Sequence, residues 1–378
     1  MDENPVVPRS PSSSLRLRKV AAWPGIRVLA WDDNFLYGSS GYQVVRLDAS
    51  RQVDPNSEWS PLARFNPRGW RKLTSRSTLC YRLVRDGFHA LTISNGATHK
   101  PSLVGAVAGA IVVCPPDTDQ FHVTHTIRRG TRPLHITSVP AGNIYWGEYF
   151  DNRERAAVHI YASTDSGSTW QIGYTFPPGS IRHIHNIVYD RWADCLWILT
   201  GDNGAECKVL RASCDLSSVE TVLSGSQQAR AVALLPARDW LYLSTDTPSE
   251  KNHVYRLDRA GQLERVGDLS SSSICGCQVS SPTREIASES HREAMFFSTM
   301  VEPSTANPTR EVHLVGSIDG IEWPVLARWT KDRLSMRFFQ YGNAFLPDGE
   351  NRTCYLAATT IAVQNDDLVT TLWEVVVA

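Results

Sequence analysis

The chain has 378 residues, of which 42% are apolar, 9% aromatic and 20% charged. This apolar content suffices for a sizeable core, in one large domain or two ordinary ones, and excludes a disordered chain. With 38 Lys and Arg against 39 Asp and Glu, the net charge of -1 creates no overall field that attracts nucleic acid or an anionic membrane. No run approaches the roughly 18 uninterrupted apolar residues of a membrane helix. We therefore expect neither nucleic acid nor a membrane as a partner, and binding has to come from a local site.

The first residues, MDENPVVPRSPSSSLRLRK, carry acids, then Pro and Ser, and contain no apolar stretch of the kind found in secretory signals. We expect residues 1–14 to form a flexible tail and residues 15–378 a single domain, in a cytoplasmic protein. A secreted form that had already lost a signal would look the same. The eight cysteines are too sparse for a disulfide scaffold, so we expect buried thiols.

Short runs rich in β-branched and aromatic residues recur along the whole chain, separated by Gly, Pro, Asp, Asn and Ser. Apolar residues at helical spacing are almost absent, so the pattern predicts an all-β protein. The predicted strands, in chain order, are 27–31, 35–39, 42–47, 89–94, 110–114, 134–139, 143–150, 158–163, 185–189, 195–201, 208–212, 231–236, 240–245, 253–257, 295–300, 312–317, 354–359 and 370–377.

These strands repeat as a module of about 45 residues. The clearest copies span 134–176, 183–225 and 229–269; two more follow, at 295–329 and 337–377, and two less regular units precede them, at 26–65 and 70–128. Seven four-stranded antiparallel units predict a seven-bladed β-propeller, in which radial repetition hides the sheet edges. Six or eight blades are the alternatives.

The last unit shows only three convincing strands, whereas residues 15–23 are apolar enough to form a spare one. We expect this N-terminal segment to supply the missing edge strand of the seventh blade and to close the ring. The alternative is that it simply trails with the tail.

One local motif points to a family. Ser163 to Trp170 fits S-x-D-x-G-x-T-W, and Ser317 to Trp323 is a shortened copy. This pattern resembles the Asp-box, or BNR repeat, of sialidase-like propellers. The resemblance implies a turn between the third and fourth strands of a blade, on the face opposite the active site, and hence a structural role for Asp165 and Asp319. Asp215 is identified as part of a decayed third copy.

In a propeller, the loops between second and third strands share one face with the loops that enter the innermost strands. The repeat therefore predicts a polar pocket on that face between blades three and six, where carboxylates could act as general acid and base and arginines could bind an acidic sugar. The alternative is an ordinary polar propeller surface. The residues placed there are Arg132, His135, Glu148, Tyr149, Arg182, His183, His185, Asp202, Asn203, Arg230, Asp246, Lys251, Asn252, His253, Glu302, Gln340, Tyr341 and Asn343.

His183 and His185 are the most informative pair, since alternate residues of a strand point to the same side. They could bind one divalent metal ion, with Glu148 or Asp202 completing the ligand shell. Alternatively, one histidine could accept a proton during β-elimination on a uronic acid. Apart from this metal ion, the sequence predicts no cofactor.

The resemblance to sialidases also implies an arginine triad on the substrate carboxylate, a tyrosine nucleophile and an aspartate in an early loop. Arg132, Arg182 and Arg230 could form the triad, and Tyr149 or Tyr341 could be the nucleophile, but no spacing forces this mapping. Asp32 and Asp33 are the early acids.

We therefore predict a carbohydrate-active propeller, a glycoside hydrolase or polysaccharide lyase, whose partner is an acidic or decorated oligosaccharide or polysaccharide. The alternative is a non-catalytic propeller that binds a protein or glycan on the same face. The sequence does not specify an oligomeric state. The predicted catalytic residues are Glu148, Tyr149, His183, His185 and Asp202, and the predicted substrate-binding residues are Arg132, Arg182, Arg230, Asp246, Lys251, Glu302 and Tyr341.

Overall fold

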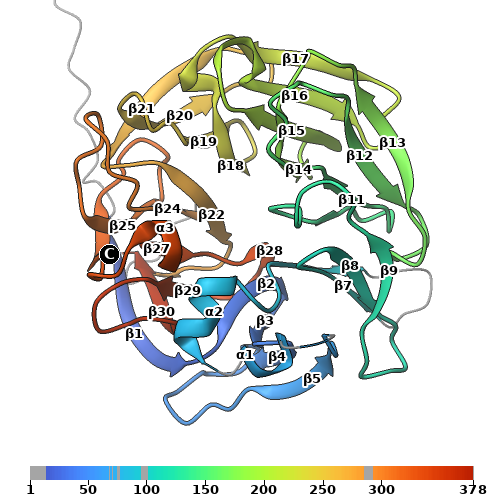
Figure 1. Cartoon of the computed structure of the whole chain (residues 1–378). Helices are drawn as coiled ribbons and strands as arrows, with labels where there is room; N and C mark the ends of the chain where they lie inside the picture. Colours follow the sequence, from blue (N-terminus) through green and yellow to red (C-terminus); the bar gives the residue numbers. More distant parts are fainter. Residues whose placement is uncertain are drawn as a thin grey trace, which may run out of the picture.

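The computed structural model describes residues 14–67, 69, 71–74, 77–94, 101–284 and 293–377. These residues form an all-β ring of seven blades around a central axis (Figure 1). The predicted fold class and blade number are thus confirmed. Apart from Ser14, the predicted tail lies outside the described residues.

In blades one to six, four antiparallel strands run from the axis outward in chain order, so the first strand of each set is the innermost. Blade one contains β2 (Arg27–Asp33), β3 (Phe35–Ser40), β4 (Gln43–Asp48) and β5 (Ser60–Arg64); blade two contains β6 (Ala90–Ser94), β7 (Ser102–Val107), β8 (Ala110–Cys114) and β9 (His122–Thr126). Blade three contains β10 (Thr137–Ser138), β11 (Ile144–Gly147), β12 (Val158–Ser163) and β13 (Gln171–Phe176).

The next three blades are the most regular. Blade four contains β14 (His183–Asp190), β15 (Cys195–Gly201), β16 (Lys208–Ser213) and β17 (Val219–Ser224); blade five contains β18 (Ala231–Pro236), β19 (Leu241–Thr245), β20 (Asn252–Leu257) and β21 (Leu263–Leu269). Blade six contains β22 (Ser273–Val279), β24 (Ala294–Thr299), β25 (Glu311–Ser317) and β26 (Val325–Thr330).

The seventh blade joins the two ends of the described chain. Its inner strands are β27 (Asn343–Phe345), β29 (Tyr355–Ile361) and β30 (Val369–Val377), and its outermost strand is β1 (Leu15–Pro24). β1 pairs antiparallel with β30, from Leu15 opposite Val377 to Pro24 opposite Val369. The prediction that an N-terminal strand closes the ring is confirmed.

Two short strands add to this plan. β28 (Asp348–Asn351) pairs parallel with the inner edge of β2, and β23 (Thr283–Arg284) pairs parallel with β30.

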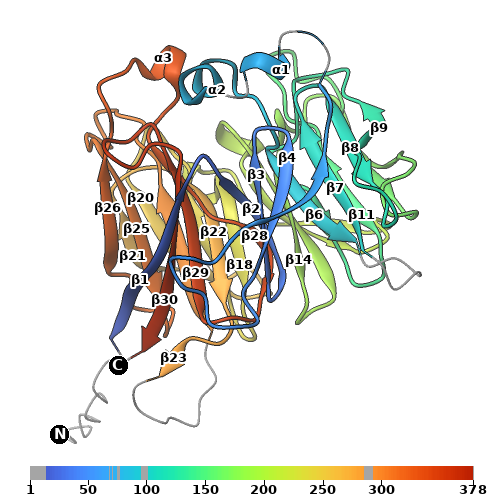
Figure 2. The ribbon, with the colours of Figure 1, turned by 90° about the horizontal axis from the view of Figure 1, so that it is seen from below.

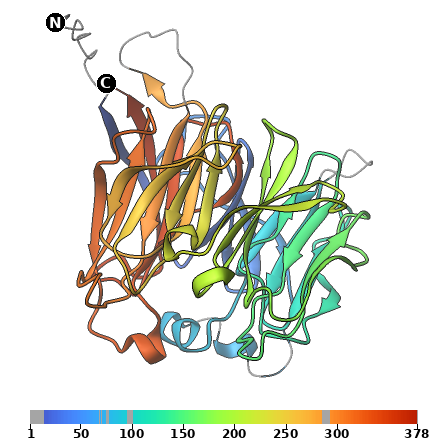
Figure 3. The same cartoon turned by 90° about the horizontal axis from the view of Figure 1, so that it is seen from above.

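The described helices are short: α1 (Arg71–Thr74), α2 (Thr78–Val84), α3 (Met336–Phe339) and the single 3₁₀ turns η1 (Gly204–Glu206) and η2 (Gln227–Ala229). We call the end of the ring where the innermost strands begin the top face, and the other end the bottom face. The three α-helices all lie at the top face, opposite the C-terminus (Figures 2 and 3). Within the described ranges, no helix is long and apolar enough to cross a membrane.

The unit predicted at 70–128 needs a correction, because its first part contains α1 and α2 rather than a strand, and the four strands of blade two start only at Ala90. Arg82 of α2 is 2% exposed; it contacts the Phe339 carbonyl oxygen and pairs with Asp332 and Asp367. This buried arginine fastens α2 to α3 and blade seven.

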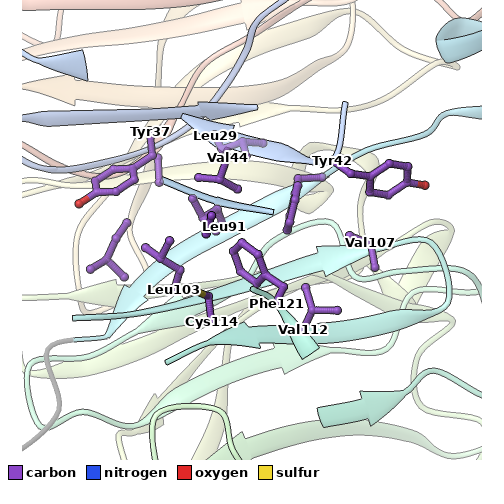
Figure 4. Packing of buried hydrophobic residues seen from close by; sticks show 14 of the residues in the cluster. Leu29, Tyr37, Tyr42, Val44, Leu91, Leu103, Val107, Val112, Cys114 and Phe121 are labelled. Carbon is purple, nitrogen blue, oxygen red and sulfur yellow. The ribbon is translucent and has the colours of Figure 1, made fainter. Parts of the chain in front are cut away.

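The apolar core lies between neighbouring blades. Between blades one and two, Leu29 and Val44 face Leu91, Val112 and Phe121 (Figure 4). The largest fully buried side chains include Trp146 and Trp197, and burial of such aromatic residues contributes strongly to blade packing.

All eight cysteines fall in the described ranges and are free thiols, five of them buried. Burial raises the pKa of Cys275 to about 11 and also raises that of its neighbour Cys277. Protonated thiols in an apolar cluster are poor metal ligands and nucleophiles. The expected burial holds for these five, and Cys80, Cys214 and Cys354 are half-buried.

Candidate functional site

The candidate site lies on the top face of blades four and five. His183 begins β14 and pairs with Gly201, the last residue of β15, so Asp202 follows directly beside it. In the same way, Arg230 precedes β18, and Asp246 follows β19. The antiparallel hairpins therefore bring the entrance of each innermost strand next to the loop that follows the second strand.

His183, His185 and Asp202 form a compact triangle. The two Nε2 atoms lie 3.1 Å apart, and each lies 3.3 Å from Oδ1 of Asp202. The histidines are 4% and 3% exposed. Of the two carboxylates predicted to accompany these histidines, Asp202 is the one found beside them.

The orientation of both rings is fixed by the backbone. Nδ1 of His183 lies 3.0 Å from the Phe150 carbonyl oxygen, and Nδ1 of His185 lies 2.9 Å from that of Ala231. A carbonyl oxygen can only accept a hydrogen bond, so each Nδ1 carries the hydrogen. Both Nε2 atoms then point toward Asp202.

His185 occupies a β-bulge, since the register between β14 and β15 passes from Ile184 to Asn186 without pairing it. Bulges occur at equivalent points in blades one, five and six, where the unpaired residues are Leu29, Val232 and Ile274. These three residues line the axial cavity described below. Bulges re-aim single side chains. In blade four the unpaired bulge residue is His185.

Two arginines hold the Asp202 carboxylate. Nη1 of Arg182 lies 3.0 Å from Oδ2, and Nη2 of Arg230 lies 3.3 Å from Oδ1. Burial opposes ionisation of Asp202, but its bonds to the two histidines and the charge of Arg230 outweigh burial and hold its pKa far below the usual range. Asp202 is therefore a fixed negative charge and unsuited to donate a proton.

Two other carboxyl groups behave in the opposite way. Burial raises the pKa of Asp246 and of Glu302, and the negative charge of neighbouring carboxylates raises both further. Oδ1 of Asp246 and the hydroxyls of Ser271 and Ser273 are buried and have no hydrogen-bond partner among the described residues. Unsatisfied buried polar atoms are rare in folded proteins and call for an explanation such as a ligand or water.

Glu148 does not belong to this cluster, although it was predicted to join the cavity. Arg129 binds its carboxylate through Nε at 2.9 Å and through Nη2, and the amide of His159 donates to it at 2.8 Å. Glu148 is 5% exposed. Its carboxylate is thus bound within the loops around the end of β11, away from the two histidines.

The predicted arginine triad is also divided. Arg182 and Arg230 are paired with aspartates, whereas Arg132 lies in a separate axial cavity of about 210 Å³ at the top face. There it meets Arg27 and Arg85, neither of which was predicted as a site residue. Burial and these two positive charges lower the pKa of Arg132 to about 10.

No carboxylate within the described part of the chain pairs with any of these three guanidinium groups. Arg27 lies 3.4 Å from the Tyr81 hydroxyl and stacks 4.0 Å above the Phe345 ring, and its buried Nε has no hydrogen-bond partner among the described residues. Arg27 is the first residue of β2 and lies two positions before the bulge residue Leu29, as Arg230 lies two positions before Val232 in blade five. This shared position in the repeat could have predicted that Arg27 lies at the top face.

The remaining predicted residues occupy different surroundings. Tyr149 packs on His183 with ring centroids 4.3 Å apart, and burial and the charges of Asp202 and Asp246 raise its pKa, so its phenol stays protonated. Tyr341 lines the axial cavity and is 37% exposed. Lys251 is exposed and, among the described residues, is absent from the linings of the axial cavity and of the large cavity at the bottom face.

Asp32 and Asp33 lie at the end of β2 and line this bottom-face cavity of about 600 Å³, together with Arg191, Glu293 and Glu350. They are at the opposite end of the ring from His183. Asp32 and Asp33 are therefore not placed to take part in chemistry at the top face.

The two predicted turns also lie at the bottom face. Asp165 connects β12 and β13 and accepts hydrogen bonds from Ser163 Oγ (2.7 Å), the Thr169 amide (2.9 Å) and Thr169 Oγ1 (2.7 Å). Asp319 accepts comparable bonds between β25 and β26. Both carboxylates are occupied within their own turns.

Comparisons with known proteins bear on the fold. No family model matches the sequence, and no curated protein matches it significantly. A solved structure titled as the WD40 β-propeller domain of Doa1 is 8% identical, with a TM-score of 0.55, over 95% of this chain and 96% of that chain. The nidogen/laminin complex is 14% identical, with a TM-score of 0.39, over 65% of this chain and 78% of that chain. At these identities, the likeness to Doa1 supports the propeller fold alone.

Proposed function

We propose that the protein is a carbohydrate-active propeller of the sialidase-like, Asp-box group, which binds an acidic oligosaccharide on its top face and cleaves it as a hydrolase or lyase. One observation carries this proposal: Arg27, Arg85 and Arg132 surround an axial cavity and lack a carboxylate partner among the described residues. Guanidinium groups form strong paired hydrogen bonds with carboxylates. A carboxylate-bearing sugar would supply the missing negative charge.

The size of the cavity limits what it can hold. A volume of about 210 Å³ is small for a ligand site and suits one sugar unit, with the rest of the chain lying across the top face. His89 and Tyr81 also line this cavity. Burial and the charges of Arg132 and Arg27 hold the pKa of His89 well below its usual value, so His89 adds no positive charge at neutral pH.

Asp246 and Glu302 support an enzymatic role. Their raised pKa values favour the protonated acid, which can donate a proton to a departing glycosidic oxygen. In hydrolysis, water then takes the place of the leaving group. In β-elimination, a base removes the C5 proton of a uronic acid, the C4–O bond breaks and a double bond forms between C4 and C5. Both reactions need this proton donor.

The experiment is a calorimetric titration with oligogalacturonate, sialyllactose and a neutral cello-oligosaccharide, followed by assays for new reducing ends and for unsaturated uronides. We expect binding of an acidic ligand only, weakened by at least about tenfold in Arg132→Gln, the loss expected from one charge-assisted contact. Arg191→Gln is the matched control, because Arg191 lines the bottom cavity and pairs with Glu293 and Glu350. Equal binding of acidic and neutral ligands would contradict the proposal.

A second candidate function is a non-catalytic binding platform, and the helices of the top face favour it. Leu79 and Leu83 of α2 are 53% and 50% exposed, and Phe338 of α3 is 56% exposed. Exposed apolar side chains in a group are typical of protein-binding surfaces. Acidic oligosaccharides that bind through Arg132 without giving any product in the assays would favour this second function.

A further inference from the structure

We propose that His183, His185 and Asp202 bind a divalent transition-metal ion, with Zn²⁺ as the best match. This inference does not depend on the proposed function, since it concerns a different cluster of side chains and can be tested without a carbohydrate. Within the described ranges, these three residues are the one group whose ligand atoms lie close enough together to share an ion.

The triangle of ligand atoms has the dimensions of a metal site. Its sides are 3.1 Å between the two Nε2 atoms and 3.3 Å from each Nε2 to Oδ1 of Asp202. Ligand atoms about 2.0–2.1 Å from a tetrahedral zinc ion lie about 3.3–3.4 Å from one another. An ion could therefore contact all three atoms with only small adjustments of the side chains.

The hydrogen bonds of the rings favour positive charge at this point. Because both Nδ1 atoms donate to carbonyl oxygens, both Nε2 atoms of neutral rings carry lone pairs. These lone pairs face each other and a carboxylate oxygen, an arrangement that is repulsive unless positive charge lies between the three atoms. Metal-bound histidines in proteins usually donate their second ring hydrogen to a carbonyl or carboxylate in this way.

The surroundings hold the ligands in place. The β-bulge at His185 turns its ring toward His183, and the absence of a side chain at Gly201 leaves room for that ring. Arg182 and Arg230 fix the carboxylate of Asp202. Such outer contacts orient metal ligands.

The charges around the site also permit a cation. Asp202 brings a negative charge beside the two imidazoles, and the arginines that contact it, Arg182 and Arg230, also pair with Asp151 and Asp246. Two imidazoles and one carboxylate, with a position left open, are also the ligand types of catalytic zinc sites.

A shared proton is the competing explanation, because a proton between the two Nε2 atoms would relieve the same repulsion. The test is to strip the purified full-length protein with a chelator, add Zn²⁺ or Co²⁺, and measure bound metal by mass spectrometry and the visible absorption of Co²⁺. We expect one Zn²⁺ per chain and an intense Co²⁺ spectrum typical of tetrahedral coordination.

His183→Gln, His185→Gln and Asp202→Asn should each weaken Zn²⁺ binding by at least about 100-fold, since loss of an outer contact alone costs about 10–100-fold. The matched control is His253→Gln, because His253 is a buried top-face histidine, 8% exposed, whose Nδ1 pairs with the carboxylate of Asp268. It should bind Zn²⁺ as wild type does.

The measurement on the wild-type protein tests the proposed metal site even if the ligand variants fail to fold. A wild-type chain that retains no Zn²⁺ and gives no Co²⁺ spectrum overturns the proposal and leaves the shared proton. Equal loss of Zn²⁺ in His253→Gln also overturns it, because the metal would then not be bound by the triangle.

Discussion

Gly201 and His185 approach each other so closely that a Cβ atom on Gly201 would lie 2.5 Å from Cε1 of His185. We therefore expect Gly201→Ala to push the imidazole out of its place and to break its 2.9 Å contact with the Ala231 carbonyl. Such overpacking costs about 1–3 kcal/mol. Thermal unfolding should show this loss, and Co²⁺ binding should weaken.

A matched substitution separates overpacking from the effect on the site. A Cβ atom on Gly276 of β22 would lie 2.7 Å from the Phe297 ring, in the core of blade six. Gly276→Ala should destabilise the protein to a similar extent and leave Co²⁺ binding intact. Wild-type Co²⁺ affinity in Gly201→Ala would show that His185 does not need this contact.

Removal of β1 should open the ring. Deletion of residues 1–24 exposes the edge of β30 and the apolar surfaces that Leu15 and Ala21 cover. We expect a loss of several kcal/mol, a large part of a domain's net stability. The measurement is the midpoint of chemical denaturation, compared with that of a protein lacking only residues 1–13, which retains all of β1. Equal midpoints for the two truncations would mean that β1 contributes little to closure.

Glu302 should make stability fall as pH rises. Burial raises its folded-state pKa, so the folded state favours the protonated acid. This contribution is present below the unfolded-state pKa of about 4.3 and is lost as pH rises through the folded-state pKa. Glu302→Gln should therefore melt higher than wild type at pH 7.5 and at nearly the same temperature at pH 4. A variant less stable than wild type at both pH values would contradict the prediction.

Asp165 should affect stability without affecting the top face. Asp165→Ala removes the acceptor of three hydrogen bonds in the turn after β12. We expect a loss of about 1–2 kcal/mol, measured as a lower melting temperature, with metal and oligosaccharide binding unchanged. Asp239→Ala, at an exposed position in the loop between β18 and β19, is a comparison that should melt close to wild type. A change in ligand binding in Asp165→Ala would mean that the bottom turn is coupled to the top face.

The sequence predicted those features that a local pattern encodes. The 45-residue repeat marks the blades because each one needs four alternating strands and three turns. The apolar segment that became β1 stood out because blade seven lacked an edge. The turn at Ser163–Trp170 could be predicted because its hydrogen bonds join residues only two to four positions apart.

Other features depend on contacts that no local pattern records. The helix α2, Thr78–Val84, has the apolar and aromatic composition of a strand, and its helical state is fixed by the Ser77 cap and by the distant partners of Arg82. Arg27 and Arg132 are far apart in sequence and meet only because the innermost strands of different blades converge on the axis. Glu148 fitted the repeat, but its partner Arg129 lies in an irregular loop.

The pairing of β1 with β30 also governs when the protein can finish folding. Arg18 of β1 and its partner Glu374 are 356 residues apart. At translation rates of roughly 5–20 residues per second, β1 leaves the ribosome roughly 20–70 s before β30 exists. During that time, β1 and the face of blade one that packs against blade seven remain open to wrong partners. Contacts this distant in sequence also slow folding after release. The nascent chain therefore has a long interval in which a chaperone could bind it, and the ring becomes cooperative only when its last strand arrives.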